Sequence, residues 1–363
     1  MMLIVIRTAS GAHPAGWYHG LSGTHGETPD ITSRGCAREQ GVASLAMSGV
    51  TGATRSETSR PPRVWAIGGG KGGIGKSVIA ANLAVVLAQR GRRVTAIDAD
   101  LGGANLHTLL GVPARGPTLA DFLHRRHERL GDIMAPTNTP GLSLINGGRA
   151  PVDSANPKHS QKARLLRHIV TLPADDVVLD LGAGTSFNVL DFFLAADHAI
   201  VVVVPEATSV ENAYQFLKAA YFRKIRRAQP RDRVKAAVAS AMADLEALGI
   251  RSPRELLLKV SDNDPIAAEA LRRESLSFDP ALVVNRARGP EHRQLGLDMA
   301  LACEDYFGRR VTFAGAIEED ELVTRSVWER RPAAERYPDS RFVSALRSIV
   351  ERLADGAEPA HGA

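Results

Sequence analysis

The stretch Gly70-Lys-Gly-Gly-Ile-Gly-Lys-Ser77 lies between an apolar run, Val64 to Ile67, and a helical pattern that begins at Lys76. It satisfies the pattern G-x-x-x-x-G-K-[ST] in the strand-to-helix context in which that pattern binds phosphate. Glycines let successive backbone N–H groups turn towards phosphates, and the helix N-terminus adds its positive dipole end. Lys76 is predicted to meet the β- and γ-phosphate oxygens, and the Ser77 hydroxyl to ligate Mg²⁺. The residues expected to contact the nucleotide here are Gly70, Gly72, Gly73, Gly75, Lys76, Ser77 and Val78.

Apolar runs alternate with helical patterns from Arg63 onwards. The runs are Val64 to Ile67, Val94 to Ile97, Leu142 to Ile145, Val177 to Leu179, Ile200 to Val204, Leu282 to Val284 and Thr312 to Ala314. Uninterrupted apolar strands separated by helices are typical of a buried parallel sheet. We therefore predict an α/β fold with a doubly wound, mostly parallel sheet over residues 61–355.

Residues 229–280 break this alternation and are predicted to be a helical insertion. They carry helical patterns at Val234 to Ala247, Arg254 to Val260 and Ile266 to Glu274, and no strand pattern. Residues 1–60 contain no Lys and show no sustained periodicity after the first six residues, so we expect a disordered tail. Alternatively, translation starts at Met47 and residues 1–46 are never made. Residues 356–363 are expected to be a C-terminal tail.

Composition excludes several classes of protein. The chain has 363 residues, 44% of them apolar, and a formal net charge of +5, which permits acidic partners but does not demand nucleic acid. Its two cysteines, Cys36 and Cys303, are too few for a disulfide framework, so a reducing cytoplasm fits best. The apolar runs are far shorter than the roughly 18 residues that span a bilayer, so no integral membrane segment is expected.

Two acidic motifs follow apolar runs. Ile97-Asp-Ala-Asp100 places two carboxylates at the carboxyl end of a predicted strand, the edge at which doubly wound sheets bind ligands. Asp98 and Asp100 could act on metal or water there, or simply cap the following helix. Val177-Val-Leu-Asp180 ends in a carboxylate suited to orienting Mg²⁺, although a structural Asp at a strand end is the alternative.

Lys71, directly after the first motif glycine, makes the loop resemble the deviant Walker A family of MinD, ParA and their relatives. The resemblance implies that ATP binding is coupled to homodimerisation, because in that family this lysine reaches the partner's phosphates. It also implies that Asp100 positions the attacking water, that Asp98 and Asp180 lie on the metal side, and that Gly184 senses the γ-phosphate. The alternative for Lys71 is a solvated loop cation.

Further segments are similar to MinD-like proteins, particularly the flagellar-number ATPases FlhG and FleN. Val203 to Tyr214, Gly182 to Leu190 and Ala314 to Asp320 carry this likeness. The run Leu282 to Arg286 contains Asn285, which the resemblance assigns to adenine recognition; a turn residue at a strand end is the alternative. Iron–sulfur carriers of the superfamily are disfavoured because the chain lacks paired cysteines.

The resemblance implies a cytoplasmic ATPase with ATP and Mg²⁺ as cofactors. We expect a slow, partner-stimulated switch that positions or counts a flagellum or other polar machine through an unidentified protein partner. The alternatives are a partition ATPase that binds nonspecific DNA and a nucleotide-binding regulator with negligible hydrolysis. The basic run 223–235, which consists of Arg223 to Arg227 with Arg231, Arg233 and Lys235, is either a solvated face or a surface for a partner or DNA. The apolar face of the last helix, 342–353, is expected to pack on its own domain, so peripheral membrane contact is disfavoured.

Overall fold

The structure, a computed structural model, describes residues 60–148, 157–227, 252–309 and 311–355. All of these lie in one compact unit. The expected N-terminal tail up to Ser59, the alternative start at Met47, the helical pattern 234–247 and the tail 356–363 fall outside the described residues.

The core of the unit is an eight-stranded sheet with the order β3-β4-β2-β5-β1-β6-β7-β8. All of its neighbouring strands run parallel except the β3–β4 pair, which is antiparallel. The prediction of a mostly parallel α/β sheet is therefore confirmed. The strands are β1 Arg63–Gly68, β2 Val94–Asp98, β3 Ala135–Pro136, β4 Leu142–Ile145, β5 Asp176–Asp180, β6 His198–Val203, β7 Ala281–Ala287 and β8 Thr312–Glu318.

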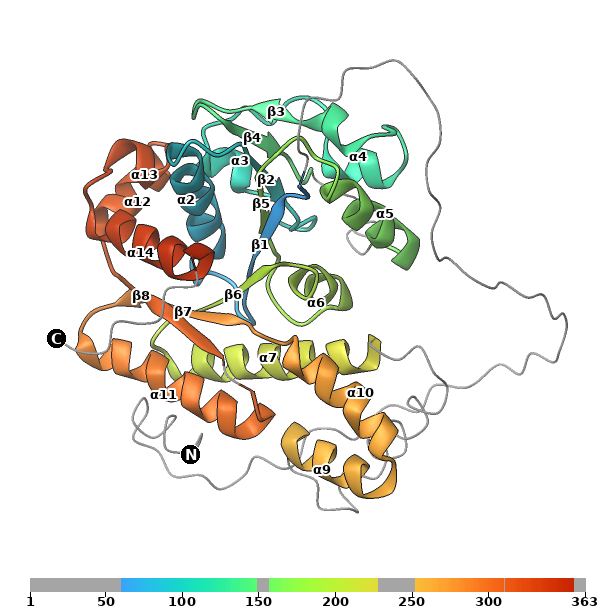
Figure 1. Ribbon diagram of the computed structural model, residues 1–363. Helices are drawn as coiled ribbons and strands as arrows, with labels where there is room; N and C mark the ends of the chain where they lie inside the picture. Colours follow the sequence, from blue (N-terminus) through green and yellow to red (C-terminus); the bar gives the residue numbers. More distant parts are fainter. Residues whose placement is uncertain (1–59, 149–156, 228–251, 310, 356–363) are drawn as a thin grey trace, which may run out of the picture. The chain divides into compact units, whose positions relative to one another are not determined.

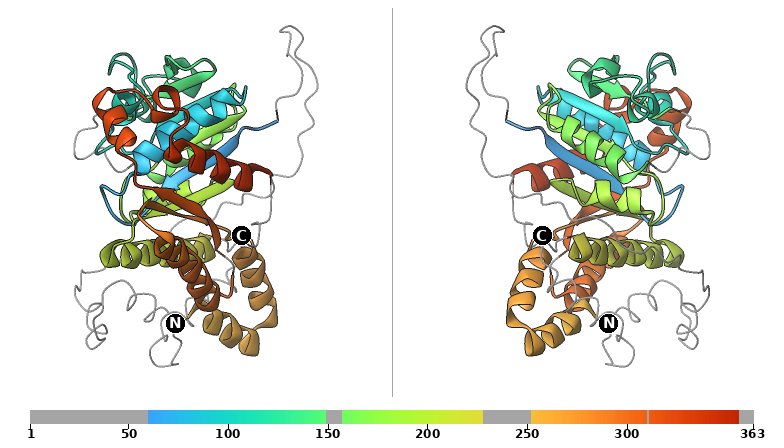
Figure 2. Two further views of the ribbon diagram at one scale, coloured as in Figure 1. Left: turned by 90° about the vertical axis from the view of Figure 1, so that its left-hand side faces the viewer. Right: turned by 90° about the vertical axis from the view of Figure 1, so that its right-hand side faces the viewer.

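Helices cover both faces of the sheet (Figure 1), and the two turned views present these faces in turn (Figure 2). One hydrophobic core lies under α2 Lys76–Gln89, α3 Leu106–Leu109, α13 Ala333–Arg336 and α14 Arg341–Asp355, next to α12 Glu321–Trp328. The other core lies under α4 Leu119–Leu123, the 3₁₀ helix η1 Leu130–Ile133, α5 His159–Ile169, α6 Phe187–Phe193, α7 Ala207–Arg227, α9 Pro253–Asn263, α10 Pro265–Leu276 and α11 Pro290–Phe307. Burial on both faces explains why the strands are apolar without alternation.

The last helix, α14, packs on its own domain, as predicted. Its apolar residues Phe342, Val343, Leu346, Ile349 and Val350 are buried in the core that α2 shares. Among the described residues, no helix combines the length and apolar character needed to cross a membrane.

Helices α9 and α10 contain the helical patterns predicted at 254–260 and 266–274. They contribute Leu256, Val260 and Leu271 to the same core as α7. Their interpretation as an insertion remains a prediction, since residues 228–251 lie outside the described part of the chain.

Candidate functional site

The glycine-rich loop joins the central strand β1 to the buried helix α2. Gly75 precedes the helix with φ of 95°, in the left-handed region that favours glycine. Gly70 lies so close to the Asn212 carbonyl oxygen of α7 that a Cβ there would collide with it. The loop is thus held between its own helix and the start of α7.

Lys76 is buried at the start of α2, with 7% of its surface exposed. Its Nζ donates to the Lys71 carbonyl oxygen at 3.0 Å. Burial lowers the pKa of Lys76, while the nearby carboxylates Asp180 and Asp100 act in the opposite direction. The pKa of Lys76 therefore depends on the charges of both acidic motifs.

Lys71 turns back onto its own chain. Its Nζ lies 2.8 Å from Glu206 Oε2 and donates to Thr208 Oγ1 at 3.0 Å, at the start of α7. The Lys71 ammonium lowers the pKa of Glu206 by a hydrogen bond and by its charge. In this conformation Lys71 is a paired surface cation. Sequence reasoning did not assign Glu206, although it lies in the Val203 to Tyr214 stretch that carried the family likeness.

Asp180 and Ser77 form the oxygen-rich part of the site. Burial and the neighbouring charge of Asp98 raise the pKa of Asp180 to about 8, and a hydrogen bond with Ser77 acts against this rise. Asp180 Oδ1 is buried and has no hydrogen-bond partner within the described residues. A buried oxygen without a partner, beside a hydroxyl, fits the hard oxygen ligands that Mg²⁺ prefers. The two side chains therefore suit a magnesium site completed by phosphate and water.

Asp98 faces Asp180 across the β2–β5 pair and anchors the turn that follows β2. Its Oδ1 accepts the N–H of Asp100 at 3.2 Å, and its Oδ2 accepts the N–H of Leu106, the first residue of α3, at 3.0 Å. Burial raises the pKa of Asp98 to about 6. The geometry matches the helix-capping alternative for Asp98, and its assignment to the metal remains a prediction.

Asp100 lies between two loops that follow neighbouring strands. Its Oδ1 accepts the N–H groups of Gly102 and Gly103 at 3.2 and 3.0 Å. The carboxyl group lies against Gly182, where an added Cβ would come within 3.3 Å of Asp100 Cγ. The Gly184 N–H in turn donates to the Gly69 carbonyl oxygen at 3.3 Å. The loop after β5 thus contacts both Asp100 and the glycine-rich loop.

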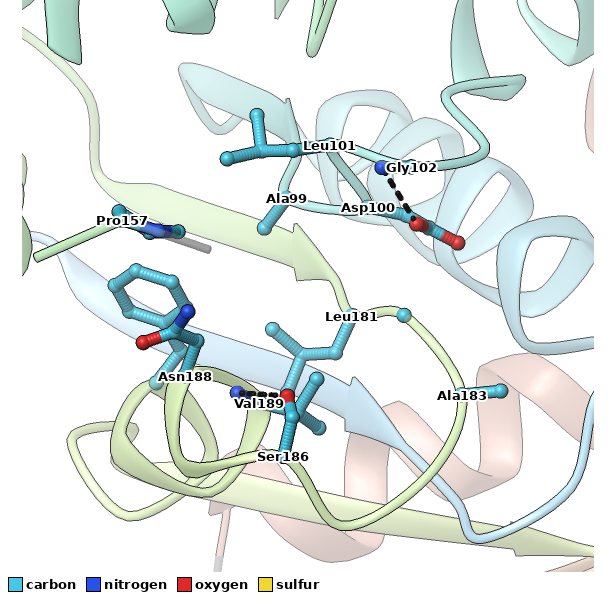
Figure 3. Close-up of a pocket in the computed structure, with 12 residues that line it drawn as sticks. Ala99, Asp100, Leu101, Gly102, Pro157, Leu181, Ala183, Ser186, Asn188 and Val189 are labelled. Carbon is cyan, nitrogen blue, oxygen red and sulfur yellow. Dashed lines mark hydrogen bonds between the residues drawn. The ribbon is translucent and has the colours of Figure 1, made fainter. Parts of the chain in front are cut away.

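A small pocket opens beside Asp100 (Figure 3), with a volume of about 190 Å³. In Figure 3 the Ala99–Gly102 turn lies on one side, and Leu181, Ser186, Asn188 and Val189 lie on the other. Sequence reasoning did not single out these last four residues. Three of them, Ser186, Asn188 and Val189, lie in the Gly182 to Leu190 segment that carries the family likeness, so that likeness was the available signal.

Asn285 differs from its expected placement. The strand does not end at this residue, because β7 continues to Ala287. Asn285 is 7% exposed, and its Nδ2 donates to the Ile74 carbonyl oxygen of the glycine-rich loop at 2.8 Å. The structure therefore brings Asn285 to the site, but as a neighbour of the loop backbone.

The described part of the basic run makes internal contacts. Arg223 Nε and Nη2 donate to the two carboxylate oxygens of buried Asp191 at 2.9 and 3.1 Å, and Lys162 Nζ lies 2.5 Å from Asp191 Oδ2. Lys224 Nζ donates to the Ser277 carbonyl oxygen at 2.8 Å. These two residues are therefore not a simple solvated face.

Comparison with known proteins shows what the chain is similar to around this site. A ParA family model described as "NUBPL iron-transfer P-loop NTPase" matches residues 61–226. The antiactivator FleN of Pseudomonas aeruginosa is 27% identical over 304 residues, which cover 83% of this chain and 89% of FleN. These matches make the chain similar to MinD/ParA proteins, and FleN, a flagellar member of that group, is the relative whose match spans most of both chains here.

Two further proteins show similarity to this chain. The flagellum site-determining protein YlxH of Helicobacter pylori is 35% identical over 162 residues, or 42% of this chain and 52% of YlxH, so the match spans about half of that relative. The septum site-determining protein MinD of Pyrococcus horikoshii, solved with Mg-ADP, superposes with a TM-score of 0.53 at 21% identity over 80% of this chain and 96% of MinD. That likeness supports the fold.

Proposed function

We propose that this MinD/ParA-type protein is an ATPase switch that dimerises when it binds Mg-ATP. The observation that carries the proposal is that both acidic motifs meet the glycine-rich loop: Asp180 pairs with Ile67 of β1, Asp100 lies against Gly182, and both carboxylates act on the pKa of Lys76. The Mg-ADP complex of the Pyrococcus MinD structure supports the choice of nucleotide and metal. The proposed nucleotide contacts are those predicted from the sequence, with Lys76 and the loop N–H groups binding the phosphates.

The chemistry follows from the positions of the side chains. Ser77 and Asp180 would hold Mg²⁺, which supplies charge neutralisation for the phosphates. Lys76 stabilises the charge that develops on the transferred phosphoryl group. Asp100 orients the attacking water with its second oxygen, because Oδ1 accepts the N–H groups of Gly102 and Gly103. Its contact with Gly182 links this carboxylate to the loop containing Gly184.

Dimerisation would use Lys71, which must first leave Glu206 and Thr208. Both partners of this ion pair are largely exposed, with 37% and 56% of their side chains accessible. Exposed ion pairs contribute little to stability, so the pair is a weak restraint that the phosphates of a second protomer can replace.

The output of the switch would be placement or number control of a cellular assembly through a protein partner in the cytoplasm. The similarity to FleN, an antiactivator, and to YlxH, a flagellum site-determining protein, supports this choice. Arg223 and Lys224 make internal contacts, so the described part of the basic run gives the DNA-binding alternative no added support.

The proposal is tested by light scattering of the full chain carrying Asp100→Ala, in Mg-ADP and then in Mg-ATP. The substitution removes the water-positioning carboxylate, so the ATP state should persist and the mass should double in Mg-ATP alone. An Asp100→Ala protein that stays monomeric in saturating Mg-ATP contradicts the switch. Dimerisation without hydrolysis by the wild-type protein, with candidate partners present, would instead favour the nonhydrolysing regulator.

Lys71→Ala is expected to leave the affinity for ATP close to that of the wild type and to abolish the ATP-dependent dimer. The reason is that Lys71 Nζ contacts Glu206 and Thr208, whereas Lys76 and the loop backbone surround the phosphate position. Calorimetry with Mg-ATP and light scattering in the Asp100→Ala background measure the two properties separately. Glu206→Gln, which removes the negative charge of the pair and keeps Lys71, is the comparison and should retain the dimer. Equal loss of dimer in both variants would show that the cis pair, and not a trans contact, matters.

A further inference from the structure

Asn285 contacts the glycine-rich loop from a strand far away in the sequence. Its Nδ2 donates to the Ile74 carbonyl oxygen at 2.8 Å across a separation of 211 residues. The side chain is 7% exposed and packs so closely on Gly75 that a Cβ at that glycine would collide with Nδ2. The amide therefore occupies space that only a glycine in the loop leaves free.

The backbone of β7 is distorted next to Asn285. Arg286, which is not a glycine, has φ of 56°, in the left-handed region. The pairing of β7 with β8 shifts register between Val284 and Ala287. Such a conformation is costly for a residue with a side chain and persists where the surrounding structure holds it, often at functional sites. The irregularity leaves Arg286 exposed and Asn285 buried against the loop.

The hydrogen bond fixes the orientation of one peptide group of the loop. No described peptide bond is cis, so the Ile74 carbonyl and the Gly75 N–H point in opposite directions. A carbonyl held by Asn285 therefore directs the Gly75 N–H away from β7. In loops of this kind the backbone N–H groups bind the phosphates, so the direction of each N–H affects phosphate affinity.

We propose that Asn285 is a positioning residue for the phosphate-binding loop, acting through Ile74 and Gly75 on every nucleoside triphosphate. The inference rests on the proposed function, since it assigns Asn285 a role in the same nucleotide site. It departs from the role that the family resemblance implies, which is recognition of the adenine base. The two roles predict different effects of changing Asn285. A positioning role weakens binding of the phosphates, whereas base recognition weakens binding of adenine only.

The experiment uses Asn285→Ala and Asn285→Leu, both of which remove the donor to Ile74, and Asn285→Leu also keeps most of the side-chain volume. Binding of Mg-ATP, Mg-GTP and inorganic triphosphate with Mg²⁺ is measured by calorimetry on the full chain. Loss of one neutral hydrogen bond predicts a decrease in affinity of about three- to tenfold. The decrease should be the same for all three probes, because inorganic triphosphate has the phosphates and no base.

The matched control is Val283→Ala, a buried position on the same strand that does not contact the loop by any described hydrogen bond. It should lower the melting temperature through a core cavity and leave all three affinities unchanged. A loss confined to ATP, with normal binding of inorganic triphosphate, overturns the inference in favour of base recognition. Unchanged affinities in both Asn285 variants overturn it as well. Failure of the wild-type chain to bind any of the probes overturns the proposed function itself.

Discussion

Lys76→Met is expected to lower the rate of ATP hydrolysis by at least about a hundredfold, the usual effect of removing one preorganised charge stabiliser from an active site. Lys76 is buried at the start of α2 and lies near Asp180 and Asp100, so no other described lysine takes its position. Methionine keeps the length of the side chain and removes its charge. ATP affinity should fall as well, because the ammonium meets the β- and γ-phosphates before and during the reaction. Phosphate release and calorimetry measure the two effects.

The control for Lys76→Met is Lys218→Met, a partly exposed lysine on α7 that lies outside the candidate site. This variant should keep the wild-type rate and affinity. A Lys76→Met protein that hydrolyses ATP at the wild-type rate contradicts the assignment of Lys76. If both variants lose activity together, the effect comes from general loss of positive charge and not from the loop.

The strands could be predicted because a strand buried on both faces has an uninterrupted apolar run in its sequence. The apolar runs at Val94 to Ile97 and Val177 to Leu179 lie within β2 and β5. Strand β3, Ala135–Pro136, has no such apolar run. It is two residues long and exists through its antiparallel pairing with β4, which is a tertiary property. The length of β7 was also missed, because its last residues follow an irregularity that no periodicity marks.

The candidate site also has a part that the sequence predicts and a part that it does not. Residues within one motif, such as Lys76 and Ser77, could be predicted because the chemistry of a phosphate loop fixes their spacing. Contacts between distant segments could not. Lys71 and Glu206 are 135 positions apart, and their pairing depends on where α7 begins relative to the loop. Arg223 is a second example, because its partner Asp191 lies on another helix. This ion pair is within the domain, and the basic run alone did not predict it.

Asp180→Asn is expected to stabilise the nucleotide-free protein at pH 8 and to abolish Mg²⁺-dependent hydrolysis. Burial first, and the charge of Asp98 next, raise the pKa of Asp180 to about 8 in the folded state, from the ordinary value of 3.8. Between these two values the folded protein binds more protons than the unfolded chain. The free energy of unfolding of the wild type therefore falls as the pH rises from about 4 to about 8. Asparagine cannot ionise, so this loss is absent in the variant.

The melting temperatures of both proteins, measured without nucleotide or Mg²⁺ from pH 5 to pH 8.5, check this expectation. The difference in favour of Asp180→Asn should grow with pH and level off above about pH 8, because Asp180 is then ionised in both states. A gain of a few kcal/mol at pH 8 is the expected order, since each unit of pKa shift is worth about 1.4 kcal/mol and the unpaired asparagine amide opposes about 1–3 kcal/mol of the total. Asp197→Asn, which changes a carboxylate at the amino-terminal end of β6, is the control for hydrolysis and should keep the Mg²⁺-dependent activity. A constant difference across the range contradicts the buried charge at Asp180. Wild-type hydrolysis by the variant contradicts its part in the metal site, because an amide is a poor substitute for a carboxylate beside Mg²⁺.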